Sequence, residues 1–111
     1  MIKVLLPIHT VSVMNAREHW SKRAKRAKIH RTTARAMLAQ WAGRPELPIT
    51  VSMTRISAGT LDGDNLQSAL KATRDGIADW LRLDDADPRV TWAYDQQRGK
   101  EKEYGVIVRV A

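Results

Sequence analysis

The residues best suited to catalysis or metal binding are two groups of aspartates. Asp62 and Asp64 flank a glycine, which permits a tight turn, and Asp84, Asp85 and Asp87 follow one another within four positions. Carboxylates that lie close together repel each other unless a cation or a proton lies between them. Mg2+ takes oxygen ligands, usually one or two carboxylates together with water and substrate phosphate. In a basic protein, such acidic groups indicate a metal-dependent phosphodiesterase that acts on nucleic acid.

The positive charge of the chain is concentrated in its first part. The formal net charge is +7, and residues 1–48 hold ten lysines and arginines against two glutamates, a net charge of +8. This asymmetry favours a polyanionic partner, and nucleic acid is favoured over an anionic membrane because the basic segment has few large apolar residues. A solvated helix face would account for the same charges. The candidate DNA contacts are Arg17, His19, Lys22, Arg23, Lys25, Arg26 and Lys28.

The composition is that of a single soluble domain over residues 1–111. Hydrophobic residues make up 43% and charged residues 28%, which is ordinary for a globular fold. No apolar run has the length of a membrane span and no signal peptide is recognisable, so we expect a cytoplasmic protein without a membrane partner. The absence of cysteine excludes disulfides, thiolate metal sites and cysteine nucleophiles.

The apolar pattern predicts an α+β fold with a mixed sheet packed by two helices. Short apolar runs and alternation predict strands over residues 2–6, 48–56, 90–94 and 104–110. Helical spacing predicts helices over residues 16–42, with Asn15 as the N-cap, and from about 64 to 83. The polar segment 95–103 predicts a hairpin between the last two strands. The expected order is strand–helix–strand–helix–strand–strand.

The second predicted helix separates a polar stripe from an apolar one. If it begins near Asp64, then Ser68, Lys71 and Asp75 follow on the same face. The helix is roughly 25 Å long, so a break at Gly76 or the following strand has to return the later aspartates to the earlier ones. The apolar stripe consists of Leu66, Ala69, Leu70, Thr73, Ile77, Trp80 and Leu81.

Structural roles alone would explain several of these residues. Asp64 could cap the helix and Asp62 could shape the turn before it. The three histidines show no metal-ligand spacing and are expected in the core or on the surface. The four tryptophans fall on helical or strand repeats, so we expect them in the core rather than stacked on bases. The predicted face of the first helix is Trp20, Ala24, Ala27, Arg31, Ala34, Leu38 and Trp41.

A longer combination of residues runs through the second half of the chain. Its parts are Asp62-Gly63-Asp64-Asn65-Leu66, Ala69-Leu70-Lys71-Ala72, Asp75-Gly76-Ile77 and Leu83-Asp84-Asp85. This combination resembles the signature of the RusA family of Holliday junction resolvases, in particular its phage and prophage branch. The resemblance covers residues 50–95, and the preceding strand and basic helix are compatible with it.

The resemblance implies a homodimer that cuts branched DNA, four-way junctions above all, by paired nicks with Mg2+, or with Mn2+ as the alternative metal. The family's metal ligands carry over to Asp62, Asp64 and Asp85, and its catalytic lysine to Lys71. An ungapped alignment from Asp64 instead places Ser68 at the lysine position, and Lys71 fits if the helix carries three extra residues. The resemblance implies supporting roles around these residues for Asn65, Asp75 and Asp84.

Two other functions stay open at this point. A protein of the same fold could bind DNA without cutting it, with the acids in structural roles. A nuclease of the same chemistry could also act on flaps or other branched DNA rather than on four-way junctions.

Overall fold

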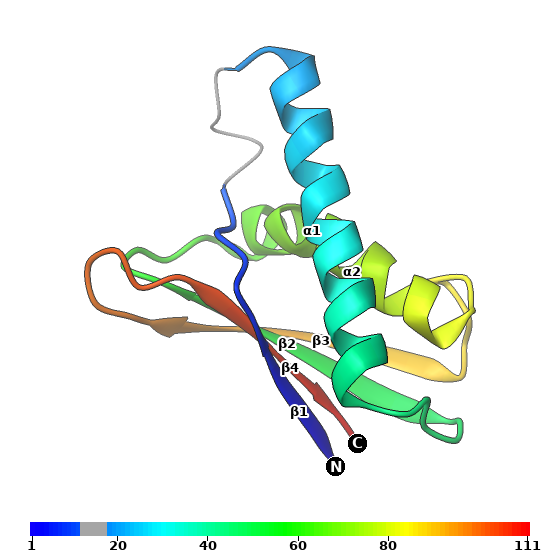
Figure 1. Cartoon of the computed structure of the whole chain (residues 1–111). Coiled ribbons are helices and arrows are strands. Elements are labelled where there is room, and N and C mark those ends of the chain that lie inside the picture. The colour runs from blue at the N-terminus through cyan, green and yellow to red at the C-terminus, as the bar shows by residue number, and fades with distance from the viewer. Residues whose placement is uncertain (12–17) are drawn as a thin grey trace.

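Two helices and a four-stranded sheet make up the α+β fold, in the predicted order (Figure 1). The computed structural model describes residues 1–11 and 18–111. The elements are β1 (Ile2–Leu6), α1 (Trp20–Trp41), β2 (Ile49–Ser57), α2 (Gly63–Leu81), β3 (Val90–Arg98) and β4 (Gly105–Val110).

The sheet has the strand order β1-β4-β2-β3, which differs from the predicted hairpin. β2 and β3 are parallel and are joined through α2, because parallel strands need a crossover connection. β4 then pairs antiparallel with both β1 and β2. Met53 of β2 is opposite Tyr94 of β3 on one side and Val108 of β4 on the other. The prediction of a β3–β4 hairpin over segment 95–103 is therefore wrong, since β2 lies between these two strands and β3 continues to Arg98.

Both helices cover one face of the sheet (Figure 1). The strand residues that alternate towards this face pack against the apolar side of α2 and the middle of α1. The opposite face carries small side chains such as Thr50, Thr91 and Ala93, which are exposed. The largest fully buried apolar side chains of this core are Leu6, Leu38, Val51, Met53, Leu70, Ile77, Val106 and Val108.

The ends of α1 project beyond the sheet, which corrects part of its predicted face. Ala34 and Leu38 are buried as expected, but Trp20 and Trp41 are 72% and 67% exposed. Ala24 and Ala27 are exposed as well, because the first half of the helix has no strand beneath it (Figure 1). The prediction that all tryptophans lie in the core is wrong for the two on α1. Trp80 is buried, and Trp92 is half-buried.

α1 begins later than predicted. Its N-cap is His19, whose Nδ1 accepts a hydrogen bond from the backbone N–H of Ser21 at 3.2 Å. Glu18 lies before the helix and forms an ion pair with Arg26, eight residues further along the chain. The predicted cap Asn15 lies outside the described residues.

Gly76 permits the close crossing of the two helices rather than a break in α2. A Cβ atom at this position would lie 2.3 Å from the carbonyl oxygen of Arg31 and 2.9 Å from Cβ of Ala34. α2 runs without interruption through this point, so the predicted break at Gly76 is wrong. The residue is needed because only glycine lets the two backbones approach this closely. Within residues 1–11 and 18–111, neither helix is both long enough and apolar enough to span a membrane.

Candidate functional site

The first aspartate pair lies at the N-terminus of α2. Asp62 is the N-cap: its backbone is extended, and Oδ1 accepts a hydrogen bond from the backbone N–H of Asn65 at 2.9 Å. Asp64 is the acidic residue of the first turn, and its side chain is exposed. Both carboxylates complement the positive end of the helix. The alternative that Asp64 is the cap is wrong, because Asp62 takes that position.

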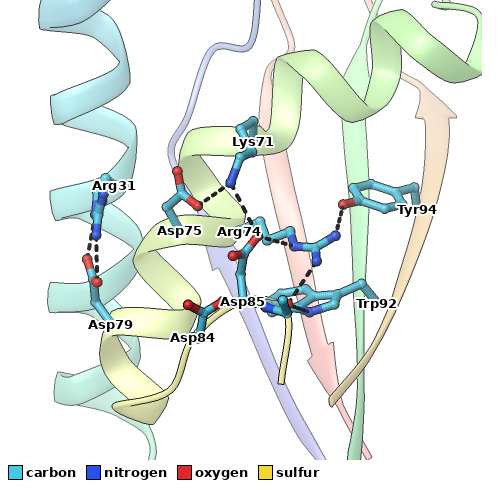
Figure 2. Close-up of polar contacts among 10 residues, drawn as sticks. Arg31, Lys71, Arg74, Asp75, Asp79, Asp84, Asp85, Trp92 and Tyr94 are labelled. Atoms are coloured by element: carbon cyan, nitrogen blue, oxygen red, sulfur yellow. Dashed lines mark hydrogen bonds and ion pairs between the residues drawn. The ribbon is translucent and has the colours of Figure 1, made fainter. Parts of the chain in front are cut away.

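The second aspartate group turns back onto α2. The helix ends with Arg82 in the left-handed conformation (φ 58°, ψ 42°), and the chain then reverses so that Asp85 lies beside the helix (Figure 2). Lys71 Nζ lies 2.7 Å from Oδ1 of Asp75 and 3.2 Å from Oδ2 of Asp85. The Asp84 carboxylate lies beside Asp85 (Figure 2), and its Oδ1 accepts a hydrogen bond from the backbone N–H of Ala86 at 2.8 Å.

Arg74 fixes the position of Asp85 from the sheet side of the helix. Its Nη2 donates to the carbonyl oxygen of Asp85 at 2.9 Å, and its Nη1 donates to Oη of Tyr94 at 2.8 Å. Its Nε lies 3.1 Å from Oδ2 of Asp85, an ion-pair distance without the alignment of a hydrogen bond. The guanidinium also lies over the ring of Trp92, 4.6 Å from the centroid, and Trp92 Nε1 donates to the same Asp85 carbonyl at 2.9 Å.

The sequence analysis missed Arg74, Trp92 and Tyr94 as parts of this site. A signal was present, because Arg74 lies four residues after Leu70 and three before Ile77, at the helical spacing of the apolar stripe. An arginine beside the apolar stripe of a helix needs a polar partner for its guanidinium, either from the sheet or from a neighbouring loop. Trp92 and Tyr94 alternate along β3 and therefore point to the same face, where they meet it.

The charges at this contact support one another. The hydrogen bond from Lys71 is the main cause of a lowered pKa of the Asp85 carboxyl, and the nearby charge of Arg74 acts in the same direction. The hydrogen bond to Asp75 is the main cause of a raised pKa of Lys71. At neutral pH, Lys71 is therefore a cation held between two carboxylates. Its side chain is 59% exposed, so water screens these attractions.

Lys71 borders a pocket of about 220 Å3 between the two helices. Ser68 and Asp75 line the same pocket from α2, as the predicted polar stripe requires, and Arg23 and Arg26 line it from α1. The pocket thus brings the polar face of α2 to the basic face of α1. A phosphate group that entered it would meet cations from both helices.

The predicted DNA contacts on α1 fall into two classes. Lys22, Lys25 and Lys28 have exposed side chains. Lys22, Lys25 and Arg26 also line a pocket of about 350 Å3 together with His9 and the buried His30. Arg26 is committed to Glu18 in an ion pair. Arg17 lies outside the described residues.

The three acids implied as metal ligands do not fit a single ion in this arrangement. Within residues 1–11 and 18–111, no three histidine, cysteine, aspartate or glutamate side chains form a group that could hold a metal. Asp85 is occupied by two cations, and Asp64 lies seven residues before Lys71, roughly 10 Å along the helix. The structure therefore brings Asp85 to Lys71 and Asp75, and leaves Asp62 and Asp64 at the helix N-terminus.

No protein-family model matches the chain. An uncharacterized protein of Xylella fastidiosa strain Temecula1 is 37% identical over 78 residues, which cover 64% of this chain and 51% of that protein. The chain thus spans about half the length of this relative. The likeness brings no activity with it, so the function has to be argued from the chain's own residues.

Proposed function

We propose that this protein is a structure-selective endodeoxyribonuclease that cuts four-way DNA junctions. The observation that carries the proposal is the return of Asp85 to Lys71 on the polar face of α2, beside the basic face of α1. These are the residues that the RusA-like combination singles out. Lys71 and Asp85 are 14 positions apart in the sequence, and their side chains are in contact in the structure.

DNA would lie along α1 in this proposal. The exposed Lys22, Lys25 and Lys28 are placed to contact backbone phosphates, which would bind without regard to sequence and with a strong dependence on salt. A symmetric dimer would present two such helices and two sites to a junction that is itself nearly two-fold symmetric. Selectivity for branched DNA would then come from the spacing of the two sites.

Lys71 would supply the positive charge at the scissile phosphate. Asp75 and Asp85 hold its ammonium at the mouth of the pocket between the helices. A fixed cation at this position would stabilise the negative charge that develops on the phosphate oxygens as the phosphodiester is hydrolysed. Dependence on Mg2+ or Mn2+ rests on the resemblance alone, since Asp62, Asp64 and Asp85 do not meet at one ion, and cleavage in EDTA tests it directly.

A second candidate, a DNA-binding protein without nuclease activity, is favoured by one observation. Lys71 and Arg74 already neutralise Asp85, and Asp62 serves as a helix cap, so each of these acids has a structural role. The same basic helix would bind DNA in either case. The two candidates differ in cleavage and agree in binding.

The deciding experiment is cleavage of an end-labelled synthetic four-way junction in Mg2+, in Mn2+ and in EDTA. We expect metal-dependent paired nicks by the unaltered protein, loss of nicking with retained binding in Asp64→Asn, and full activity in Glu101→Gln. Glu101 is a suitable control because it is an exposed carboxylate in the loop before β4.

Three results would change the proposal. Tight junction binding without cleavage in either metal would favour the binding protein. Cleavage of flaps but not of junctions would keep the chemistry and change the substrate. Full activity of Asp64→Asn would remove this aspartate from the site.

A further inference from the structure

A second concave surface lies between the C-terminal ends of α1 and α2. The helices cross at Gly76, and the Lys71 pocket is lined by residues that precede this crossing on both helices. The second pocket is lined by residues that follow it, from Arg35 on α1 and from Asp79 on α2, and has a volume of about 440 Å3. The two pockets therefore lie on opposite sides of the helix crossing.

Three arginines from three separate segments line this second pocket. Arg35 belongs to α1, Arg44 follows the end of that helix, and Arg82 caps α2. With one carboxylate, that of Asp79, the lining has a formal charge of +2. Among residues 1–11 and 18–111, none of the three arginine side chains forms a hydrogen bond or an ion pair.

Asp79, the single carboxylate of the lining, forms an ion pair with Arg31, which does not belong to the three arginines of the pocket. Arg31 Nε lies 2.7 Å from Oδ2 of Asp79, and Arg31 Nη2 donates to Oδ1 at 2.9 Å, a two-pronged contact (Figure 2). Asp79 is therefore engaged first by Arg31, and the charge of Arg35 also acts on it and lowers the pKa of its carboxyl. The lining thus holds three arginines and a single carboxylate that Arg31 already pairs, so positive charge is in excess.

A phosphate group matches this surface chemically. The guanidinium fork donates parallel hydrogen bonds to two oxygens of one phosphate, and several arginines can share such a group. The competing explanation is that these arginines only offset the carbonyl ends of α1 and α2, where cations are favoured. That explanation accounts for Arg82 at the cap of α2. It does not explain why arginines from three segments line one concave surface.

We propose that Arg35, Arg44 and Arg82 form a phosphate-binding site separate from the Lys71 pocket. The phosphate belongs either to a DNA backbone or to a free phosphate-bearing small molecule. Arg35 follows Lys28 by seven residues, which is about two helical turns and about 10 Å, so the two side chains leave α1 on the same side and one DNA molecule along that side reaches both. Only the DNA source rests on the proposed function. The phosphate site itself stands on the convergence of the three arginines.

The first test is a titration of the full chain with inorganic phosphate at low salt, followed by NMR. Trp80 lines the pocket, and its indole signal is a local reporter. We expect a saturable shift of this signal in the unaltered protein, loss of the shift in the double variant Arg35→Gln/Arg44→Gln, and an unchanged shift in Lys100→Gln/Lys102→Gln. The control removes the same charge from exposed positions in the loop before β4. A missing shift in the unaltered protein, or a shift retained in the arginine double variant, overturns the site.

The second test identifies the source of the phosphate. Junction-DNA affinity is measured against salt concentration for the same three proteins. If the site holds DNA, the arginine double variant lowers the slope of log affinity against log salt by about 1 to 2 relative to the lysine control, since each phosphate contact contributes about 0.9. Equal slopes together with a positive phosphate titration assign the site to a free phosphate group. Neither test requires cleavage, so loss of nuclease activity and loss of this site are separate results.

Discussion

Replacement of Arg74 by methionine is the sharpest test of how the site is held together. The Arg74 side chain extends from α2 and joins it to two other segments (Figure 2). Its guanidinium contacts Asp85 in the turn after α2, and Trp92 and Tyr94 on β3. Methionine keeps the aliphatic part of the side chain and removes both donors and the charge. The variant therefore measures the polar contacts with little change in packing.

The expected loss of stability follows from these contacts. The two hydrogen bonds from the guanidinium contribute about 1 to 1.5 kcal/mol each. The contact with the Trp92 ring adds about 0.5 to 1 kcal/mol, and the ion pair with Asp85 adds less than about 1 kcal/mol because it is partly exposed. The Asp85 carbonyl keeps its hydrogen bond from Trp92 Nε1, so no buried acceptor is left unpaired. Arg74→Met should thus lower the free energy of unfolding by about 2.5 to 5 kcal/mol.

Urea denaturation followed by tryptophan fluorescence measures this difference. The matched control is Arg89→Met, which removes an arginine whose partner Asp87 is two residues away and whose side chain is 57% exposed. Water screens that exposed local pair, so its removal should change the free energy of unfolding very little. A loss in Arg74→Met no larger than in Arg89→Met would refute the role of Arg74 as the link between Asp85 and the sheet.

Two further predictions concern the helix crossing and the buried histidine. Gly76→Ala should lower the free energy of unfolding by about 1 to 3 kcal/mol, because the new Cβ meets the Arg31 carbonyl and this outweighs the gain in helix propensity; a raised melting temperature would contradict the close crossing. Burial, and then the charge of Arg26, lowers the pKa of His30 below its ordinary value of about 6.5, so the unfolded chain binds more protons there and stability should fall as pH falls from 7 towards 5. His30→Gln should flatten this slope in urea denaturation at pH 7 and pH 5.5; an unchanged slope would assign the effect to other groups.

The order of elements could be predicted from the sequence, but the pairing of strands could not. Alternation along β3 and β4 identifies each as a strand, and the elements appear in the predicted order. Alternation fixes which side chains share a face and carries no information about the neighbouring strand. The connection through α2 makes β3 a parallel partner of β2. β4 therefore pairs with the opposite edge of β2. The polar residues Asp95 to Arg98, read as a hairpin tip, extend the edge strand instead.

The site was predictable to the extent that it depends on helical spacing. Ser68, Lys71 and Asp75 line one pocket because steps of three and four residues place them on one face of α2. The position of Asp85 depends instead on the left-handed Arg82 and on a hydrogen bond from β3, neither of which has a periodic signal. The exposure of Trp20 and Trp41 likewise has no periodic signal. It depends on where the sheet ends beneath α1, and the spacing along the helix does not report that.

The contacts of Arg74 also determine how the two groups of aspartates can act. Asp85 would have to move roughly 10 Å along α2 to join Asp62 and Asp64, because seven residues separate Asp64 from Lys71. Such a movement would break the hydrogen bonds that Arg74 and Trp92 donate to the Asp85 carbonyl and the contact of Lys71 with its carboxylate. A chain that keeps these contacts keeps the two groups apart. In the proposed nuclease, the acids at the helix N-terminus and the acid beside Lys71 would therefore act on different atoms of the DNA.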